Sequence, residues 1–193
     1  MQDWLVFDLG GVLMNFTGMD ALSELTGRPV SDIHDLLLHS VAVKDFQTGR
    51  VEPDVFSVAM VAELELSLSP DELLHLWAEW EAGPMTGALD LLDRLGRENA
   101  IACLSNTNIL HWQRLTSRYG LLERFERCFV SHEIGLSKPD PRIFEHVVAD
   151  LRTPPHRITY FDDNAEIIEA AIAFGFDAHR VDSPQDIELV LSK

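Results

Sequence analysis

The chain has 193 residues, of which 46% are hydrophobic and 24% charged, so it resembles neither a disordered chain nor a small disulfide scaffold. Such a length suits one domain, or one domain that carries an insertion. Its formal net charge of −17 repels nucleic acid and anionic membranes, so we expect neither as a partner. Any phosphate site must therefore carry local positive charge of its own.

The N-terminus and the cysteines favour a cytoplasmic protein. The N-terminal sequence MQDWLVFDLG lacks the basic region and long apolar core of a signal peptide. No apolar run reaches the roughly 18 residues that a membrane span needs. Cys103 and Cys128 lie in apolar stretches that we expect to be strands, and we predict buried free thiols, with a disulfide as the alternative. Whether the protein is a monomer or a homodimer stays open.

Five short apolar runs predict the strands of one sheet. They are 4–8 (WLVFD), 100–104 (AIACL), 128–131 (CFVS), 158–161 (ITYF) and 178–181 (AHRV). Segments with helical spacing lie between them and begin after Gly87, Asn108, Pro139 and Asn164. Strands that alternate with helices imply right-handed crossovers and a mostly parallel sheet with helices on both faces. The predicted fold class is therefore α/β and Rossmann-like.

The stretch from about residue 19 to residue 81 interrupts this alternation with helical patterns only. Three helix starts are marked there by Ser31-Asp32, Pro53-Asp54 and Ser69-Pro70. We predict an α/β core at 1–16 and 84–193, with a small all-helical insert at 17–83. An insert that leaves just after the first strand would hang over the sheet edge as a lid.

Polar residues follow three of the predicted strands: Asp8, Ser105-Asn106 and Asp162-Asp163. Ligands of an open parallel sheet bind beyond the carboxyl ends of its strands, so these residues should converge on one crevice. Taken alone, Asp8 is more typical of a helix cap or a turn residue. Adjacent carboxylates repel each other, and Mg²⁺ prefers such oxygen ligands. The alternative for Asp162 and Asp163 is that they cap the following helix.

Three more side chains could bind a phosphoryl group. Lys138 stands in GLSKPDPRIF, and a lysine held rigidly before two prolines can pair with phosphate or with an aspartate. A solvated surface lysine is the alternative. Ser105 and Asn106 offer hydroxyl, amide and backbone donors to phosphate oxygens, and capping of the following helix is their alternative role.

Four segments, in this order, resemble the motifs of the haloacid dehalogenase-like (HAD) superfamily. They are FDLGGVL at 7–13, LSNTN at 104–108, SKPDPRIF at 137–144 and YFDDNAEIIEAA at 160–171. The helical insert falls where this superfamily carries its C1 cap. The sequence also resembles the sugar 1-phosphate phosphatases, such as glucose-1-phosphate phosphatases, and the N-terminal phosphatase domain of epoxide hydrolases. The resemblance implies a Mg²⁺-dependent phosphatase for a small phosphorylated metabolite, a sugar phosphate foremost.

The resemblance also implies roles for the motif residues. Asp8 is implied to be the nucleophile that forms an aspartyl phosphate. Ser105 is implied to bind the phosphoryl group with Asn106 beside it, and Lys138 to neutralise charge on the nucleophile and the phosphate. For Mg²⁺, the implied ligands are Asp8, the backbone carbonyl of Gly10 and Asp163, with Asp162 acting through water.

Gly10 departs from the family pattern. The superfamily usually has a second aspartate at this position, which protonates the leaving group and later activates water. A cap residue or a water could substitute for it. Alternatively, the leaving group needs little help, as with a sugar 1-phosphate or an acyl phosphate, or the protein is catalytically weak.

Three other functions share some of these residues. A 2-haloacid dehalogenase also uses an aspartate nucleophile, but it needs no metal, so the carboxylates at 162–163 argue against it. A phosphomutase normally relies on the aspartate that Gly10 replaces. A non-catalytic binding protein that kept the fold is supported by Gly10 alone.

Several residues outside the motifs are candidates for contacts with the leaving group. In the insert they are Phe46, Arg50 and Trp77, although the two aromatic residues are more typical of a core and Arg50 of a solvated turn. His111 and Trp112 could line the crevice, or lie on a helix surface or in the core. No close grouping of His and Cys indicates a zinc site.

Overall fold

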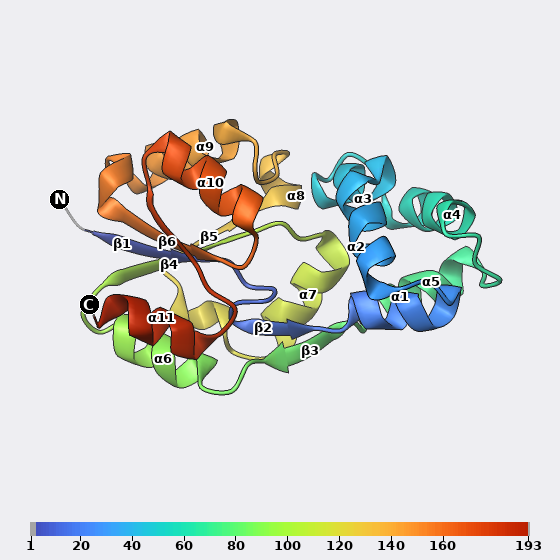
Figure 1. Ribbon diagram of the computed structural model, residues 1–193, viewed down its shortest axis with the longest axis horizontal. Coiled ribbons are helices and arrows are strands. Elements are labelled where there is room, and N and C mark those ends of the chain that lie inside the picture. The colour runs from blue at the N-terminus through green and yellow to red at the C-terminus, as the bar shows by residue number, and fades with distance from the viewer. Residues whose placement is uncertain (1–2, 193) are drawn as a thin grey trace.

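The computed structural model of the chain describes residues 3–192, and a five-stranded sheet forms the centre of its larger part (Figure 1). The strands lie in the order β5-β4-β1-β6-β7, and all neighbouring pairs are parallel. Their bounds are β1 (Trp4–Phe7), β4 (Ala100–Ser105), β5 (Arg127–Val130), β6 (Ile158–Asp162) and β7 (Asp177–Arg180). The predicted α/β fold is confirmed, and each predicted strand is present within one residue at either end.

Helices cover both faces of this sheet. On one face lie α6 (Ala88–Leu95), α7 (Ile109–Arg118) and α11 (Pro184–Leu191), and on the other lie α9 (Pro141–Leu151) and α10 (Ala165–Phe174). Strand residues alternate between the two layers: Leu5 and Phe7 pack under the first set of helices, and Trp4 and Val6 under the second. The alternation is the period of two of a strand that is buried on both faces.

The central strand places its end between the ends of its neighbours. Phe7 is paired with Cys103 of β4 and with Phe161 of β6, and the Asp8 amide donates to the Phe161 carbonyl at 2.8 Å. The next residue of each strand therefore reaches the same edge. Cys103 is a buried free thiol as predicted, and Cys128 is a free thiol that is only half-buried.

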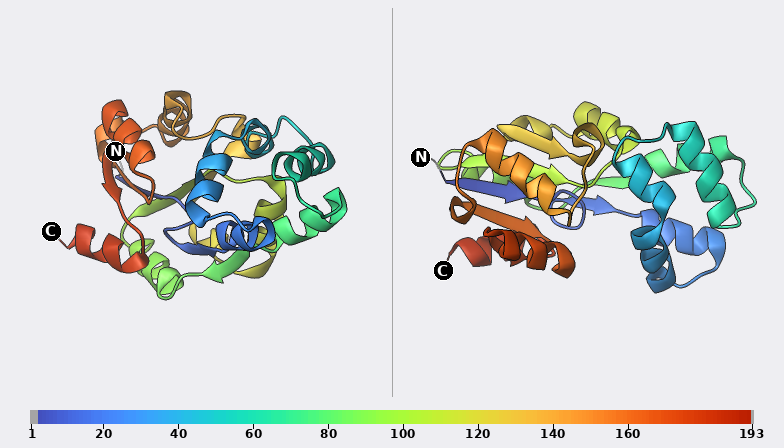
Figure 2. Two further views of the ribbon diagram at one scale, coloured as in Figure 1. Left: turned by 45° about the vertical axis from the view of Figure 1, so that its right-hand side comes forward. Right: turned by 90° about the horizontal axis from the view of Figure 1, so that it is seen from above.

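Five helices form a separate unit beyond the carboxyl edge of the sheet (Figure 2). They are α1 (Gly18–Thr26), α2 (Val30–His39), α3 (Val41–Gln47), α4 (Pro53–Glu63) and α5 (Pro70–Ala78). The unit has an apolar core of its own, in which Phe46 stacks on Phe56 with ring centroids 4.2 Å apart and Trp77 packs edge-on to Phe56. Phe46 is thus a core residue, because its ring fills the space between α3 and α4.

A short antiparallel ribbon joins the helical unit to the sheet. Its strands are β2 (Met14–Phe16) and β3 (Glu81–Pro84), and Phe16 is paired with Glu81. The sequence did not predict this ribbon, since strands this short that contain Gly83 and Pro84 carry no alternating pattern. The prediction also omitted α3 and α11, the short helix α8 (Ser131–Ile134) and the 3-10 turns Leu122–Arg124 and Pro155–Arg157. Among the described residues, no helix is long and apolar enough to span a bilayer.

Candidate active site

Asp8 stands directly after the central strand, at the bottom of the crevice. Its side chain is 13% exposed, its Oδ1 accepts a hydrogen bond from the Leu9 amide at 2.7 Å, and Lys138 Nζ lies 3.1 Å from the same oxygen. Burial raises the pKa of Asp8 to about 7, against the attraction of Lys138 and with the help of the negative charges of Asp162 and Asp163. A cation beside this carboxyl would favour its ionised, nucleophilic form.

Lys138 joins the two buried aspartates. Its ammonium group is fully buried and lies 2.7 Å from Asp162 Oδ2, 2.9 Å from the Leu104 carbonyl and 2.9 Å from the Tyr160 hydroxyl. Burial alone would lower the pKa of Lys138, but the charges of Asp162 and Asp8 outweigh it and raise the pKa above the ordinary lysine value. Lys138 is therefore a fixed positive charge in a chain that is strongly acidic overall.

Asn106 fixes the backbone at Lys138. The Asn106 amide nitrogen donates to the Lys138 carbonyl at 2.9 Å, and the Lys138 amide donates to Asn106 Oδ1 at 2.9 Å. These two bonds close a ring that holds the end of β4 against the loop before α9. These bonds use the Asn106 oxygen and one of its two amide hydrogens, so the side chain keeps one amide hydrogen that could be donated to a phosphoryl group.

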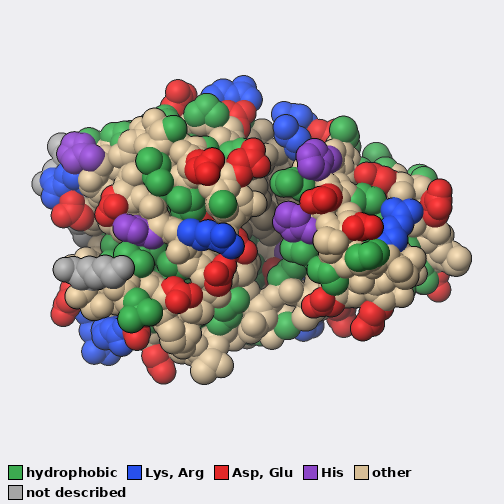
Figure 3. All heavy atoms as spheres, in the orientation of Figure 1, with side chains coloured by type: hydrophobic (Ala, Val, Ile, Leu, Met, Phe, Trp, Pro, Cys, Tyr) green, Lys and Arg blue, Asp and Glu red, His purple; other side chains and the backbone are tan. Residues whose placement is uncertain are grey.

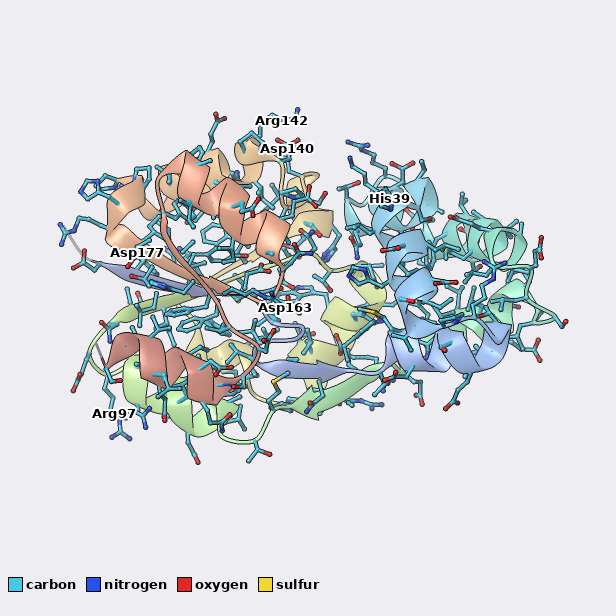
Figure 4. All side chains as sticks on the ribbon, viewed as in Figure 1. His39, Arg97, Asp140, Arg142, Asp163 and Asp177 are labelled. Atoms are coloured by element: carbon cyan, nitrogen blue, oxygen red, sulfur yellow. The ribbon has the colours of Figure 1, made fainter. Side chains whose placement is uncertain are left out.

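The two adjacent carboxylates differ sharply in their surroundings. Asp162 is fully buried, with Oδ2 accepting from Lys138 and from the Tyr160 hydroxyl, and Oδ1 accepting from the Asn164 amide at 2.9 Å. Its oxygens are thus already satisfied by protein donors. Asp163 is partly open to the crevice, and burial followed by the charge of Asp162 raises its pKa. Figure 4 labels Asp163 at the sheet edge that faces the helical unit.

These carboxylates fit a divalent cation. One oxygen from each of Asp8, Asp162 and Asp163 lies within 4.8 Å of the others. Burial and then the neighbouring negative charges raise the pKa values of Asp8 and Asp163, and a bound cation would oppose both effects by favouring the ionised carboxylates. Mg²⁺ typically takes one or two carboxylates and keeps positions for waters and phosphate, so Asp8 and Asp163 suit it as direct ligands. Asp162, which is saturated by its own bonds, suits the indirect role through water.

The two glycines after Asp8 serve different purposes. Gly11 has a φ of +74°, and a Cβ there would lie 2.2 Å from Asp163 Oδ2, so a side chain at this position would collide with the carboxylate. Gly10 has an ordinary φ, and a Cβ there would meet no atom within 4 Å. The position that usually carries the second aspartate is therefore open space.

His111 links the start of α7 to the helical unit. Its Nε2 lies 2.7 Å from the Trp77 carbonyl and must donate to it, so Nδ1 accepts from the Asn108 amide at 3.1 Å. Asn108 Oδ1 in turn caps α7 by accepting from the Leu110 and His111 amides. Burial lowers the pKa of His111 to about 4, because a charged imidazole would lose its hydration and its acceptor role.

This shift predicts a loss of stability in acid. Since the folded pKa of His111 is about 4 against 6.5 when exposed, the unfolded chain binds the proton first as the pH falls between these values. At about pH 5 this costs the folded state about 2 kcal/mol relative to about pH 7. Denaturant unfolding of the wild type and His111→Gln, which keeps a donor for Trp77, should show this pH-dependent difference. Parallel pH profiles for the two proteins would contradict the assignment.

Asp8, Asp163 and Lys138 line one cavity of about 1140 Å³ between the sheet edge and the helical unit. Figure 3 shows the corresponding hollow between the two parts. Every predicted site residue lines it except Asp162, which lies behind the wall. Arg50, Trp77 and His111 also line it, whereas Phe46 does not. Trp112 is packed against the sheet core.

Some residues of the site carried no signal in the sequence. Tyr160 sits inside an apolar strand and looked like an ordinary core residue, yet its hydroxyl bonds both Lys138 and Asp162. The carbonyl of Leu104 was equally invisible, because backbone groups have no sequence signature. Ser131 also escaped notice; its hydroxyl accepts from the Thr107 amide at 2.9 Å and donates to the Thr107 carbonyl at 3.0 Å, which stiffens the loop after β4.

Comparison with known proteins agrees with this geometry. Residues 2–175 match the family model of haloacid dehalogenase-like hydrolases, and the chain belongs to this family of hydrolases. It is 22% identical over 191 residues to the D-ribitol-5-phosphate phosphatase of Bacteroides thetaiotaomicron, covering 94% of this chain and 93% of that protein. It is 31% identical over 147 residues to (S)-2-haloacid dehalogenase 1 of Pseudomonas sp., covering 74% of this chain and 63% of that protein.

A solved structure shares the fold over nearly the whole length. It is an HAD-family enzyme of Bacteroides thetaiotaomicron in complex with magnesium and inorganic phosphate, with a TM-score of 0.75 and 24% identity, covering 93% of this chain and 94% of that one. The fold of this chain is therefore one in which a related protein holds Mg²⁺ and phosphate.

Proposed function

We propose that this chain is a Mg²⁺-dependent phosphatase that hydrolyses a small phosphorylated metabolite through an aspartyl phosphate on Asp8. A sugar phosphate is the leading candidate for the substrate. The observation that carries the proposal is the buried ammonium of Lys138 between Asp8 and Asp162, with Asp163 within reach of a shared cation. This arrangement brings an anionic substrate and an anionic nucleophile together without net repulsion. The named phosphatase relative and the magnesium and phosphate complex support it.

The chemistry follows from where the charges lie. The Asp8 carboxylate attacks phosphorus, the bond to the leaving oxygen breaks, and that oxygen takes a proton from water or a cap residue. Water then attacks phosphorus, the bond between phosphorus and the Asp8 oxygen breaks, and the proton that the water loses returns to the group that protonated the leaving oxygen. Lys138 and Ser105 hold the phosphoryl oxygens during both steps, and Mg²⁺ held by Asp8 and Asp163 would supply further positive charge for these oxygens. Asp162 and Tyr160 orient Lys138.

We propose further that the helical unit acts as the cap, with the chain divided at 1–16 and 84–193 for the core and 17–83 for the cap. Arg50 and Trp77 reach the cavity from this unit and are the candidates for contacts with the leaving group. The two free thiols fit a reducing compartment, so we expect a cytoplasmic protein that is a monomer or a homodimer.

A 2-haloacid dehalogenase is the second candidate, because one relative at 31% identity has that activity by name. The cluster of Asp8, Asp162 and Asp163 favours the phosphatase, since dehalogenation by an aspartate needs no metal. Incubation with 2-chloropropionate in the absence of Mg²⁺ separates the two. Halide release there would favour the dehalogenase, and we expect none.

The phosphatase function is tested by measuring phosphate release from a panel of sugar phosphates and acyl phosphates in the presence of Mg²⁺. We expect phosphate release that stops when EDTA removes the metal and returns when Mg²⁺ is restored. Release from no member of the panel would contradict the phosphatase function.

The open space at Gly10 predicts a gain of activity. Gly10→Asp places a carboxyl where a Cβ meets no atom within 4 Å, so it can supply the missing proton transfer. We expect kcat on an alkyl phosphate with a poor leaving group to rise about a hundredfold, and kcat on an acyl phosphate to change little. Gly10→Ala, which adds the Cβ without the acid, is the reference. An equal effect of both variants on both substrates would contradict the prediction.

A further inference from the structure

Glu81 is a buried carboxyl without a hydrogen-bond partner. It opens β3, it is 8% exposed, and its Oε2 is buried with no partner among residues 3–192. Arg114 lies on the neighbouring helix α7; its Nη1 bonds Glu79 Oε1 at 3.0 Å, and its Nε is also buried without a partner in the described part of the chain. A buried polar atom without a partner is costly and calls for an explanation.

The position of Glu81 relative to the phosphate site is set by the ribbon. Gly10 forms a bridge with Met14, and Phe16, two residues further along β2, is paired with Glu81. Two residues of strand correspond to about 7 Å. Glu81 therefore stands across the ribbon from a residue two positions beyond the one that pairs with Gly10, and it lines the same cavity as Asp8.

The cavity that Glu81 lines also has apolar lining residues. Met14, Phe16 and Met85 line the cavity along the ribbon and the turn that follows it. Burial raises the pKa of Glu81 to about 8, although Arg114 and Arg118 of α7 draw it down in part. Near neutral pH the group therefore holds its proton for much of the time and can both donate and accept a hydrogen bond.

We propose that Glu81 binds a hydroxyl group of the leaving group and thereby selects sugar or polyol phosphates over phosphates without hydroxyls. The proposal rests on the phosphatase function. A hydroxyl both donates and accepts, so it would satisfy the unpartnered Oε2, while the C–H faces of a sugar pack against Met14, Phe16 and Met85. A site built to hydrogen-bond a hydroxyl discriminates strongly against ligands that lack it, because its own polar group is then left unpaired.

The test measures binding apart from turnover. In the background of Asp8→Asn, calorimetry gives the Kd of glucose 1-phosphate and of inorganic phosphate in the presence of Mg²⁺. We expect Glu81→Leu to weaken glucose 1-phosphate about ten- to a hundredfold and inorganic phosphate by less than about twofold. Glu81→Gln keeps one donor and one acceptor, so its Kd for glucose 1-phosphate should lie between the value for Glu81→Leu and the value for the protein with Glu81 intact. Glu98→Gln, at an exposed side chain outside the cavity, is the matched control and should change neither Kd.

Thermal unfolding separates binding from a structural role. If the Glu81 carboxyl gains its hydrogen-bond partner only when a ligand binds, Glu81→Leu removes an unpartnered carboxyl and should keep or raise the Tm of the ligand-free protein. Three results would overturn the proposal. The first is a lower Tm of Glu81→Leu combined with equally weakened binding of both ligands. The second is an unchanged Kd for both ligands, and the third is no binding of glucose 1-phosphate at all. Because these readouts need no catalysis, failure of the wild type to release phosphate would refute the phosphatase function and leave the inference on Glu81 to be judged by the Kd values.

Discussion

Asp8→Asn is expected to reduce phosphate release by about 10⁴-fold or more, because the amide that replaces the carboxylate is no nucleophile and carries no charge for a metal. The side chain keeps its size, and its oxygen can still accept from the Leu9 amide as Asp8 Oδ1 does now. The fold should therefore survive. Steady-state release of phosphate from the most active substrate of the panel is the measurement.

A surface aspartate provides the control for this variant. Asp150 lies in α9 and pairs with Arg127 on the outside of the molecule. Asp150→Asn should leave phosphate release within about twofold of the wild type, as surface changes usually do. If Asp8→Asn kept more than about a tenth of the activity, another group would have to be the nucleophile.

Lys138→Ala is expected to lower kcat about a thousandfold, because it removes the fixed positive charge that faces the nucleophile and the phosphoryl group. The same change leaves Asp162 and Asp8 buried without their shared cation. Breaking a buried ion pair in this way typically costs about 3–5 kcal/mol of unfolding free energy. Both losses should therefore appear together, in kinetics and in denaturant unfolding.

Activity of this variant has to be measured where it remains folded, which circular dichroism establishes. Arg127→Ala removes an exposed cation from the pair with Asp150 and serves as the comparison, since exposed ion pairs contribute about 1 kcal/mol or less. A Lys138→Ala protein that is stable and nearly as active as the wild type would show that the ammonium has no part in phosphoryl transfer.

The sequence predicted most of the site residues because their positions follow from the topology of the sheet. Asp8, Ser105 and Asp162 are the residues at which buried strands end, and parallel strands bring their ends to one edge. The apolar runs marked those ends within one residue. Lys138 was predicted from its motif, and the structure brings it to within 3.1 Å of Asp8.

Features that depend on side-chain contacts across the fold were not predictable in the same way. The bonds of Asn106 to the Lys138 backbone and of His111 to the Trp77 carbonyl join segments 32 and 34 residues apart, and no local pattern encodes them. Phe46 illustrates a choice that the structure decides in favour of the core position that the sequence made more typical. Its place in the insert made it a candidate for substrate contact, but stacking on Phe56 buries it in the helical core.

The most direct test of the account is the structure of the protein with Mg²⁺ and fluoroberyllate, a mimic of the phosphoryl group on an aspartate. We expect beryllium bonded to an Asp8 oxygen, the Lys138 ammonium in contact with the fluorine atoms, and Mg²⁺ held by Asp8 and Asp163. Fluoroberyllate that is absent from Asp8, or a metal that bypasses Asp163, would contradict it.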